Sequence, residues 1–463
     1  MVELQTNVIY CGDCLDILKG LPNDCVDLIY LDPPFFSQKH YEVLWGDGAE
    51  LRAFQDRWKG GINHYVEWMK ERLEQCKRIL KDTGSIYLHC DWHASHYLKV
   101  TMDGLFGENN LRNEIVWQRT FAHGGATTGF SRVHDVILFY SKSDDFVFNR
   151  LHQPYSEHYI RNFFTHEDKK GRYRLVIATG SGETKSDYAW KGVKATKGRH
   201  WAYTKEKMEQ LEKEGRLVYS KSGMPSVKQY LTDKEGTLVT DIWTDIEVIH
   251  SQSKERLGYP TQKPLALLDR IINASSNKND IVLDPFCGCG TSLVSAFKNH
   301  RRFIGIDVSP TACKLMARRL RGEGVVGLVI QNLPTSIKQL EKLPHFEFQN
   351  WVCQQLNGKV SARKSCDRGI DGWILGTIPI QVKQSEDVGR NPIDNFETAI
   401  RRENKKQGVF VAFSFGKGAE EEKSRAKLKE GLNIKLLTVE DILKPDFNPM
   451  ELFSEAGTQK KLI

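Results

Sequence analysis

The sequence lacks any apolar run of membrane-spanning length, and its N-terminus lacks a charged-then-apolar signal pattern. We therefore expect a cytoplasmic protein that does not span a membrane. Cysteine is also scarce, with ten residues in 463. Neither Cys11-x-x-Cys14 nor Cys287-x-Cys289 is followed by a second Cys or His pair at zinc spacing. These spacings predict no structural zinc site, and the thiols are expected to be reduced.

Positive charges only slightly outnumber negative ones, and the net charge of the whole chain is +7. This balance favours a polyanionic partner without being diagnostic. With 40% hydrophobic and 27% charged residues, the chain is long enough for two or three domains with proper cores. The sequence leaves the oligomeric state open, with a homodimer as one candidate.

A first motif, Asp32-Pro33-Pro34-Phe35, follows an apolar run of strand length at 26–31. Two prolines remove two backbone N–H donors and fix φ, so the corner offers only hydrogen-bond acceptors. Such a corner suits an exocyclic amino group on a planar base, with Phe35 stacked on the ring. The alternative is a proline-rich turn with a capping aspartate, and these residues alone do not decide between the two.

A second motif follows the short apolar run 281–283 and contains two glycines that permit close approach of a ligand. A helix pattern opens after it, with Thr291 or Ser292 as the expected N-cap. The next apolar run, 303–306, ends at Asp307, where an acid is placed to bind ribose hydroxyls. A nicotinamide site would fit the same pattern, but the third glycine of the dinucleotide fingerprint is missing. The motif reads Asp284-Pro285-Phe286-Cys287-Gly288-Cys289-Gly290-Thr291.

Together the two motifs resemble the amino-methyltransferases of DNA, and their order resembles the permuted β class of adenine-N6 and cytosine-N4 enzymes. The resemblance covers roughly residues 1 to 325. It implies that Asp32, Pro33, Pro34 and Phe35 bind a flipped base. It also implies that S-adenosylmethionine is held by Phe286, Gly288, Gly290 and Asp307, with Asp284 and Thr291 in the same loop. An aspartate start is commoner among the adenine enzymes, so adenine is favoured and cytosine-N4 is the alternative.

Two further elements resemble cofactor-side parts of this family. In the family, an acid after the first strand (here 8–10) faces the adenine amino group of the cofactor, which assigns Asp13 that role; capping of the following helix is the compatible alternative. The stretch 258–264 resembles the element ahead of a helix, here 265–274. Through it Thr261, Lys263 and Pro264 are expected to wall the methionine end of the cofactor.

The resemblance implies an α/β fold, a doubly wound Rossmann-like sheet in permuted order, formed by residues 1–149 and 256–333. Residues 150–255 form the expected target-recognition insert. Within it, the segment 161–200 carries ten Lys or Arg against four Asp or Glu, interleaved with aromatics. Such a segment is often only a solvated face, but its position between the motifs favours binding to double-stranded DNA.

Two stretches of the first half are predicted to have no direct chemical role. Apolar and aromatic residues recur at helical spacing over 65–80, which indicates a helix that packs on the core with no site implied. The polar and aromatic stretch 37–45 has no clear period and is predicted to be a loop over the active site.

A further unit is predicted over 345–450. Gln381 and Lys383 share one face of a strand that follows Asp371. With Asp371, they resemble the metal site of PD-(D/E)xK nucleases, in the Mrr-like restriction group with its Q-x-K variant. The resemblance implies a Mg²⁺ held by Asp371, a water activated by Lys383, and Glu347 orienting the water shell of the metal. Gln381 replaces the second carboxylate, so a domain that only binds DNA, or an ordinary hairpin, is the alternative.

The sequence thus predicts a site-specific DNA adenine-N6 methyltransferase of a restriction–modification system, with a fused endonuclease as its extension. A methyltransferase for ribosomal RNA or a protein glutamine would use a similar corner, but it usually places the cofactor motif first. A DNA-binding protein without catalytic activity would need neither motif.

Overall fold

The structure is a computed structural model that describes residues 4–37, 40–44, 50–55, 60–121, 129–182, 188–233, 235–250, 252–253, 255–257, 262–361, 369–444 and 446–452. For 40–44, 50–55 and 450 it describes the backbone alone. The chain forms two compact units, one made of Met1–Asn149 with Asp241–Ile463 and the other of Arg150–Thr240. The insert was expected to extend to residue 255. It ends earlier because Ile242–Trp243 (β16) pairs in parallel with β6 of the main sheet.

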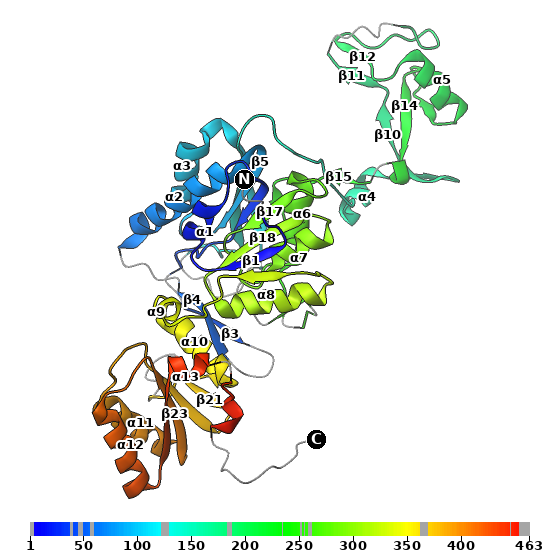
Figure 1. The fold of residues 1–463 in the computed structure, drawn as a ribbon. Helices are drawn as coiled ribbons and strands as arrows, with labels where there is room; N and C mark the ends of the chain where they lie inside the picture. Colours follow the sequence, from blue (N-terminus) through cyan, green and yellow to red (C-terminus); the bar gives the residue numbers. More distant parts are fainter. Residues whose placement is uncertain are drawn as a thin grey trace. The chain divides into compact units, whose positions relative to one another are not determined.

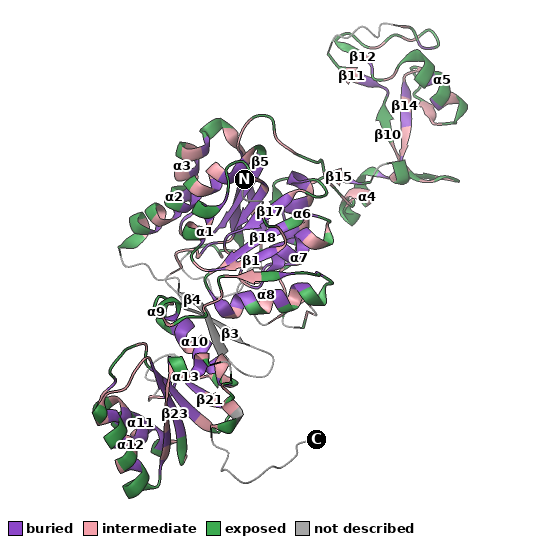
Figure 2. Cartoon of the chain, viewed as in Figure 1, coloured by how far each residue is buried: buried purple, intermediate pink, exposed green. Residues whose placement is uncertain are grey.

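A nine-stranded sheet forms the centre of the first unit (Figure 1). The apolar residues of its central strands are buried, as Figure 2 shows for β5, β17 and β18. In spatial order the strands are β16 (Ile242–Trp243), β6 (Leu111–Gln118), β7 (His134–Ser141), β5 (Leu80–Cys90), β2 (Val26–Leu31), β17 (Ile281–Asp284), β18 (Arg302–Asp307), β1 (Val8–Cys11) and β19 (Val329–Gln331).

The order of these strands explains how two distant motifs meet. β2 and β17 are parallel neighbours, with Leu28 opposite Val282 and Ile29 opposite Leu283. Parallel neighbours end at the same edge of a sheet, which is where ligands bind in open α/β folds. The first strand, β1, lies between β18 and β19, so the N-terminal segment and the segment around residue 330 share one sheet. The α/β fold with a permuted order is therefore confirmed.

Two groups of helices flank this sheet and lie on opposite sides of it in Figure 1. The first group consists of one helix after β1, one before β5 and one after β5, and the helix before β5 packs on the other two. The second group surrounds β17 and β18. The helices are α1 (Cys14–Gly20), α2 (Gly61–Ile79) and α3 (Ser95–Phe106), then α6 (Leu265–Ser275), α7 (Thr291–Lys298) and α8 (Pro310–Gly322).

The stretch predicted as a loop over the active site contains regular structure. His40–Leu44 (β3) and Glu50–Gln55 (β4) form an antiparallel hairpin. Its polar and aromatic residues gave no clear alternation, because a two-stranded hairpin does not require one buried face. Residues 38–39 and 45–49 lie outside the described residues.

The unit Arg150–Thr240 has its own small core around Trp190, Trp201 and Met208. Its sheet is antiparallel, in the order β13-β14-β10-β9. Short strands and turns explain why no long periodicity marks this stretch of sequence. Its elements are β8 (His152–Gln153), α4 (Glu157–Phe163), β9 (His166–Asp168), β10 (Gly171–Ile177), β11 (Thr179–Ser181), β12 (Arg199–Trp201), α5 (Lys205–Lys213), β13 (Leu217–Tyr219), β14 (Pro225–Tyr230) and β15 (Thr237–Leu238).

The C-terminal part of the first unit has a separate five-stranded sheet, β20 to β24 in sequence order, with apolar clusters on both faces. The central strands β22 and β23 are parallel neighbours. Its elements are α9 (Ile337–Glu341), α10 (His345–Gln355), β20 (Gly358–Val360), β21 (Gly372–Ile374), β22 (Ile378–Val382), α11 (Arg390–Arg402), β23 (Gln407–Ala412), α12 (Lys417–Glu430), β24 (Asn433–Thr438) and α13 (Val439–Leu443). No helix among the described residues has the length and apolar character that crossing a membrane requires.

Candidate active site

A cavity of about 410 Å³ lies at the edge of the sheet where β2 and β17 end. Both sequence motifs line it, the first with all four of its residues and the second with Asp284 to Cys289 and Thr291. The structure therefore places the proline corner and the glycine loop, far apart in sequence, in one cavity. Asp307 at the end of β18 and Asp13 after β1 lie in the same lining.

Asp32 offers one occupied and one open acceptor oxygen. Its Oδ2 accepts a hydrogen bond from Nζ of Lys263 at 2.5 Å. Its Oδ1 is buried, and no residue in the described ranges donates to it. A buried carboxylate oxygen without a donor is costly unless a ligand supplies one. The exocyclic amine of a base is such a donor, so the residues present fit an amine substrate.

A residue of helix α2 holds the proline corner in place. The hydroxyl of Tyr65 donates to the Pro34 carbonyl at 2.7 Å, which fixes that peptide. Helix α2 was predicted to have no role in a site, and this was wrong: Trp68 and Arg72 also line the cavity. Helical periodicity indicates which face is buried, but not which loop end it is buried against.

Phe35 is held by a fully buried polar group behind it. The ring of His89 lies 5.4 Å from the ring of Phe35 between centroids. His89 in turn is bonded to the Tyr30 hydroxyl at 2.9 Å and to Asp135 at 3.3 Å. These bonds fix the imidazole, so the aromatic face at position 35 is preorganised for stacking on a planar base.

Lys263, expected at the methionine end of the cofactor, lines the cavity and contacts the first motif. It is buried, its ammonium pairs with Asp32, and it lies 5.1 Å from the centroid of the Phe35 ring. The sequence offered no signal for this pairing, since the two residues come from separate loops. Pro264 is the N-cap residue of α6 and does not line the cavity. Thr261 lies outside the described residues.

The glycine loop is tied to the acid that follows it. The amide of Gly288 donates to Asp307 at 2.8 Å, and the amide of Ser309 donates to its other oxygen at 2.9 Å. Burial raises the pKa of Asp307 to about 6. Asp307 lines the cavity, and a carboxylate can accept more hydrogen bonds than these two, so it fits the hydroxyl groups of a ribose.

Three assignments within this loop need correction. Gly290 does not line the cavity; its φ of +76° and the nearby Met316 require glycine. Neither Thr291 nor Ser292 caps α7, because Gly290 is the N-cap and has no side chain. The Thr291 hydroxyl accepts from Arg319 at 3.1 Å.

Asp284 is a buried structural acid. The Ser292 hydroxyl and the Phe286 amide both donate to its carboxylate. Burial raises the pKa of Asp284 to about 7. These two bonds shape the turn that brings Phe286 to the cavity, where its ring lies 5.8 Å from that of Trp68.

Asp13 caps helix α1, as the alternative expectation had it. Its Oδ1 accepts from the amide of Leu15 at 2.8 Å. Arg72, which is almost fully buried, donates to both carboxylate oxygens, at 2.8 and 2.9 Å. The capping role leaves the side chain half-exposed in the cavity lining, so it is compatible with a ligand there.

A second cavity, of about 450 Å³, lies in the C-terminal part and contains Asp371, Gln381 and Lys383. The carboxylate of Asp371 accepts from the Gln381 side chain and the Val382 amide, both at 2.7 Å. Gln349 of α10 donates to its other oxygen at 2.8 Å. Carboxylate and amide oxygens are Mg²⁺ ligands, so this donor set fits the ion through a single carboxylate with water completing the shell.

Glu347 does not belong to that cavity, which corrects its assignment to the metal site. Its Oε2 accepts from the Ser309 hydroxyl at 2.9 Å, on the side of α8. Two residues along a helix correspond to more than half a turn, so Glu347 and Gln349 face opposite sides. Burial raises the pKa of Glu347 to about 8. Gln349 is the α10 residue that sequence reasoning missed.

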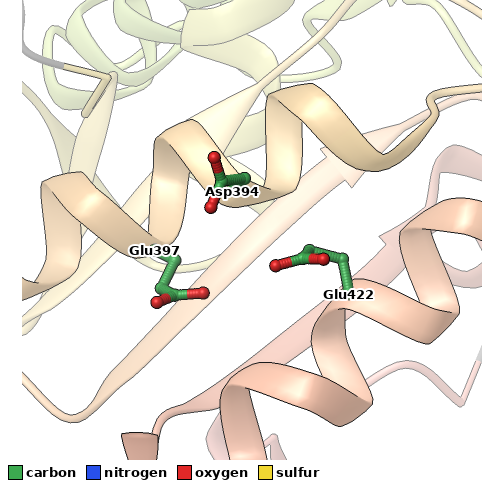
Figure 3. Close-up of side chains that lie close together, drawn as sticks. All are labelled: Asp394, Glu397 and Glu422. Carbon is green, nitrogen blue, oxygen red and sulfur yellow. The ribbon is translucent and has the colours of Figure 1, made fainter.

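Three acids outside both cavities lie close together. Figure 3 shows the carboxylates of Asp394 and Glu397 on α11 and Glu422 on α12 facing the gap between the helices. Arg425 pairs with Glu397 and with Glu422, and Arg401 pairs with Glu397 at 3.3 Å. The arginines compensate these charges, so the cluster is an ion-pair network that joins α11 to α12.

The sequence matches two families. Residues 26–318 match the N6/N4 family described as DNA methylase, which is more than half of the chain. The chain belongs to this DNA methylase family. Residues 340–444 match a second family, described as restriction endonuclease, which covers the C-terminal sheet and its helices. Enzymes of the methylase family use S-adenosylmethionine, and the cavity residues described above fit such a group.

Individual relatives agree with the family. The type II methyltransferase M.EcaI of Enterobacter cloacae is 34% identical over 326 residues, which is 68% of this chain and 69% of the relative. The DNA adenine methyltransferase YhdJ of Escherichia coli is 27% identical over 318 residues, 68% of this chain and 83% of the relative. Among solved structures, TTHA0409 of Thermus thermophilus, a DNA modification methylase by its description, is 17% identical, with a TM-score of 0.38 over 70% of this chain and 98% of that one.

Proposed function

We propose that this DNA methylase transfers a methyl group from S-adenosylmethionine to the N6 amine of an adenine rotated out of duplex DNA. The observation that carries the proposal is the open Oδ1 of Asp32 in a cavity shared with the glycine loop. When an amine donates one hydrogen to Oδ1 and one to the Pro33 carbonyl, its lone pair is drawn out of conjugation with the ring and becomes available to attack a methyl group. Phe35 holds the base by stacking.

Positioning supplies most of the rate in this account. Bound S-adenosylmethionine supplies an electrophilic methyl group that needs no further activation. Asp32 orients the amine before transfer and accepts the proton that becomes acidic once the nitrogen carries the methyl group. Asp307 and the Gly288 loop hold the ribose side, and Trp68 and Phe286 provide apolar walls. Lys263 keeps Oδ2 occupied, so Oδ1 is the oxygen that acts.

Adenine is favoured over cytosine-N4 by the aspartate that starts the first motif and by the name of the E. coli relative, a DNA adenine methyltransferase. Cytosine-N4 is the alternative, because the exocyclic amine of cytosine is attached to a planar ring in the same way as the N6 amine of adenine. A restriction–modification role is favoured by the match of residues 340–444 to restriction endonucleases.

The unit Arg150–Thr240 is proposed to contact DNA. Several of its cations are used internally, for example Lys228 with Asp168. Within the described part of this unit, no ion-pair partner is found for Arg161, Lys169, Arg172, Lys194 and Lys197. These side chains are candidates for phosphate contacts, and the exposed apolar residues Val176 and Ile177 lie beside Arg174 and Arg199 in a surface hollow.

We further propose that the C-terminal part cleaves DNA with Mg²⁺ held by Asp371, with Lys383 beside the attacking water. The test of the methyl-transfer proposal is transfer of label from S-adenosylmethionine to DNA, RNA and protein in parallel, followed by mapping of methylated positions in host DNA. Labelling of RNA or protein alone would refute it.

A further inference from the structure

The methyl donor's cavity is lined in part by the restriction endonuclease-like part of the chain. Pro344 and Phe346, at the start of α10, lie in the same lining as Asp307 and Val308. Phe346 is only 9% exposed, while Val308 is 41% exposed. A large aromatic ring at a cavity wall that also contains a ribose-binding acid is suited to cover a purine.

Helix α10 is attached to the same turn that carries this acid. The Ser309 amide donates to Asp307, and the Ser309 hydroxyl donates to Glu347 of α10 at 2.9 Å. Ser309 and Glu347 are both almost completely buried. Farther along, Gln354 of α10 donates to Thr311 of α8 at 2.6 Å. These bonds fix helix α10, which carries Phe346, relative to the turn at Asp307.

We propose that S-adenosylmethionine binds against α10, with Phe346 as part of the adenosine subsite. This inference rests on the proposed function, because it places the cofactor's adenosine near Asp307. Adenine is planar and mostly apolar, and covering it with an aromatic ring removes area from water that would otherwise stay exposed. The endonuclease-like part thus completes a binding site of the methyltransferase part.

The same helix carries a contact with the second cavity. Gln349 donates to Asp371, and it lies three residues after Phe346, one turn along α10. A ligand that orders the first turn of α10 therefore orders the helix that holds the Asp371 carboxylate. If α10 is instead only structural packing, cofactor binding leaves this helix unchanged.

The first test is isothermal titration of the full chain with S-adenosylmethionine. Phe346→Ala is expected to raise Kd about tenfold, because one aromatic contact with the ligand is lost. Phe346→Tyr keeps the ring and is expected to keep Kd within about twofold. Gln355→Ala, on the same helix but outside the cavity lining, is the matched control and is expected to leave Kd unchanged.

The second test needs no variant. Hydrogen exchange of the unaltered chain is expected to slow over residues 345–355 when S-adenosylmethionine is added. Two results would overturn the inference and leave the proposed function standing. One is that the unaltered chain and Phe346→Ala bind S-adenosylmethionine with equal affinity. The other is that the unaltered chain binds it without slower hydrogen exchange over α10. A chain that binds no S-adenosylmethionine refutes the proposed function, and the inference with it. If Phe346→Ala does not fold, the exchange experiment and Phe346→Leu decide.

Discussion

The ammonium of Lys263 lies 2.5 Å from Oδ2 of Asp32, so a residue preceding α6 holds the acid that follows β2. Lys263 is buried, and its pairing leaves Oδ1 as the oxygen available to a substrate amine. We infer from this pairing that Lys263 positions Asp32.

Lys263→Met should therefore lower kcat for methyl transfer by about 10- to 100-fold, since a misplaced catalytic group costs about this much. The Kd for S-adenosylmethionine should change little. Lys263→Arg restores the cation and should recover part of the rate. Single-turnover kinetics and titration calorimetry on the same samples separate the two quantities. If Lys263→Met loses affinity for the cofactor and keeps its rate, Lys263 contacts the methionine end of the cofactor and does not position Asp32.

The hydroxyl of Tyr65 fixes the Pro34 peptide, and Tyr65→Phe removes the hydrogen bond to the Pro34 carbonyl. The free energy of unfolding should fall by about 1 kcal/mol, and methyl transfer should slow by a few fold. Urea unfolding and initial rates measure these effects. Tyr87→Phe, which removes the hydroxyl of a β5 residue bonded to Ser275 of α6, is the control: it should lose stability without slowing transfer. Equal rates in Tyr65→Phe and the unaltered protein would show that the corner does not depend on α2.

The affinity for S-adenosylmethionine should depend on pH through Asp307. Burial raises its pKa from 3.8 to about 6, so the ionised form is present above pH 6 and lost below it. The protonated form has one fewer acceptor for the amides of Gly288 and Ser309 and for a ribose. Kd should thus rise as pH falls through about 6. Asp307→Asn should bind weakly at every pH, with a flatter profile; a steep profile retained in that variant would assign the titration to another group.

Methyl transfer was easier to anticipate from sequence than the identity of the supporting residues. Each motif follows a run of buried apolar residues, and parallel strands that carry motifs at their ends must meet if they are neighbours. β2 and β17 are neighbours, so Asp32 and Gly288 share a cavity. The edge strand β19 is short, covering only Val329–Gln331, and Val326 in the turn before it is exposed.

What the sequence missed depends on contacts between distant segments. Lys263 precedes a helix start and gave no sign of its partner 231 positions away. Glu347 and Gln349 lie two positions apart and face opposite sides of α10. A small error in the expected rotation of this helix therefore assigns the wrong residue to the Asp371 cavity. The amphipathic pattern of α2 predicted burial correctly, but Tyr65 is buried against the Pro34 carbonyl as well as the core.

Lys383 and Asp371 line one cavity of the C-terminal part. With Mg²⁺, the unaltered protein should cut unmethylated plasmid, and Lys383→Ala should reduce cutting by about 100-fold or more. Methyl transfer should be the same in both, because Lys383 is outside the methyltransferase cavity. Lys406→Ala, near the start of β23 and outside this cavity, is the matched lysine control. If the unaltered protein binds plasmid but never cuts it, the C-terminal part binds DNA without cleaving it.

The most direct measurement is nucleoside analysis of duplex DNA after reaction with labelled S-adenosylmethionine, for the unaltered protein and for Asp32→Ala. We predict N6-methyl-2′-deoxyadenosine as the labelled product of the unaltered protein. Asp32→Ala should give no product while its Kd for S-adenosylmethionine stays within a few fold, because Asp32 binds the amine and not the cofactor. Label in N4-methylcytosine, or undiminished transfer by Asp32→Ala, would contradict this account.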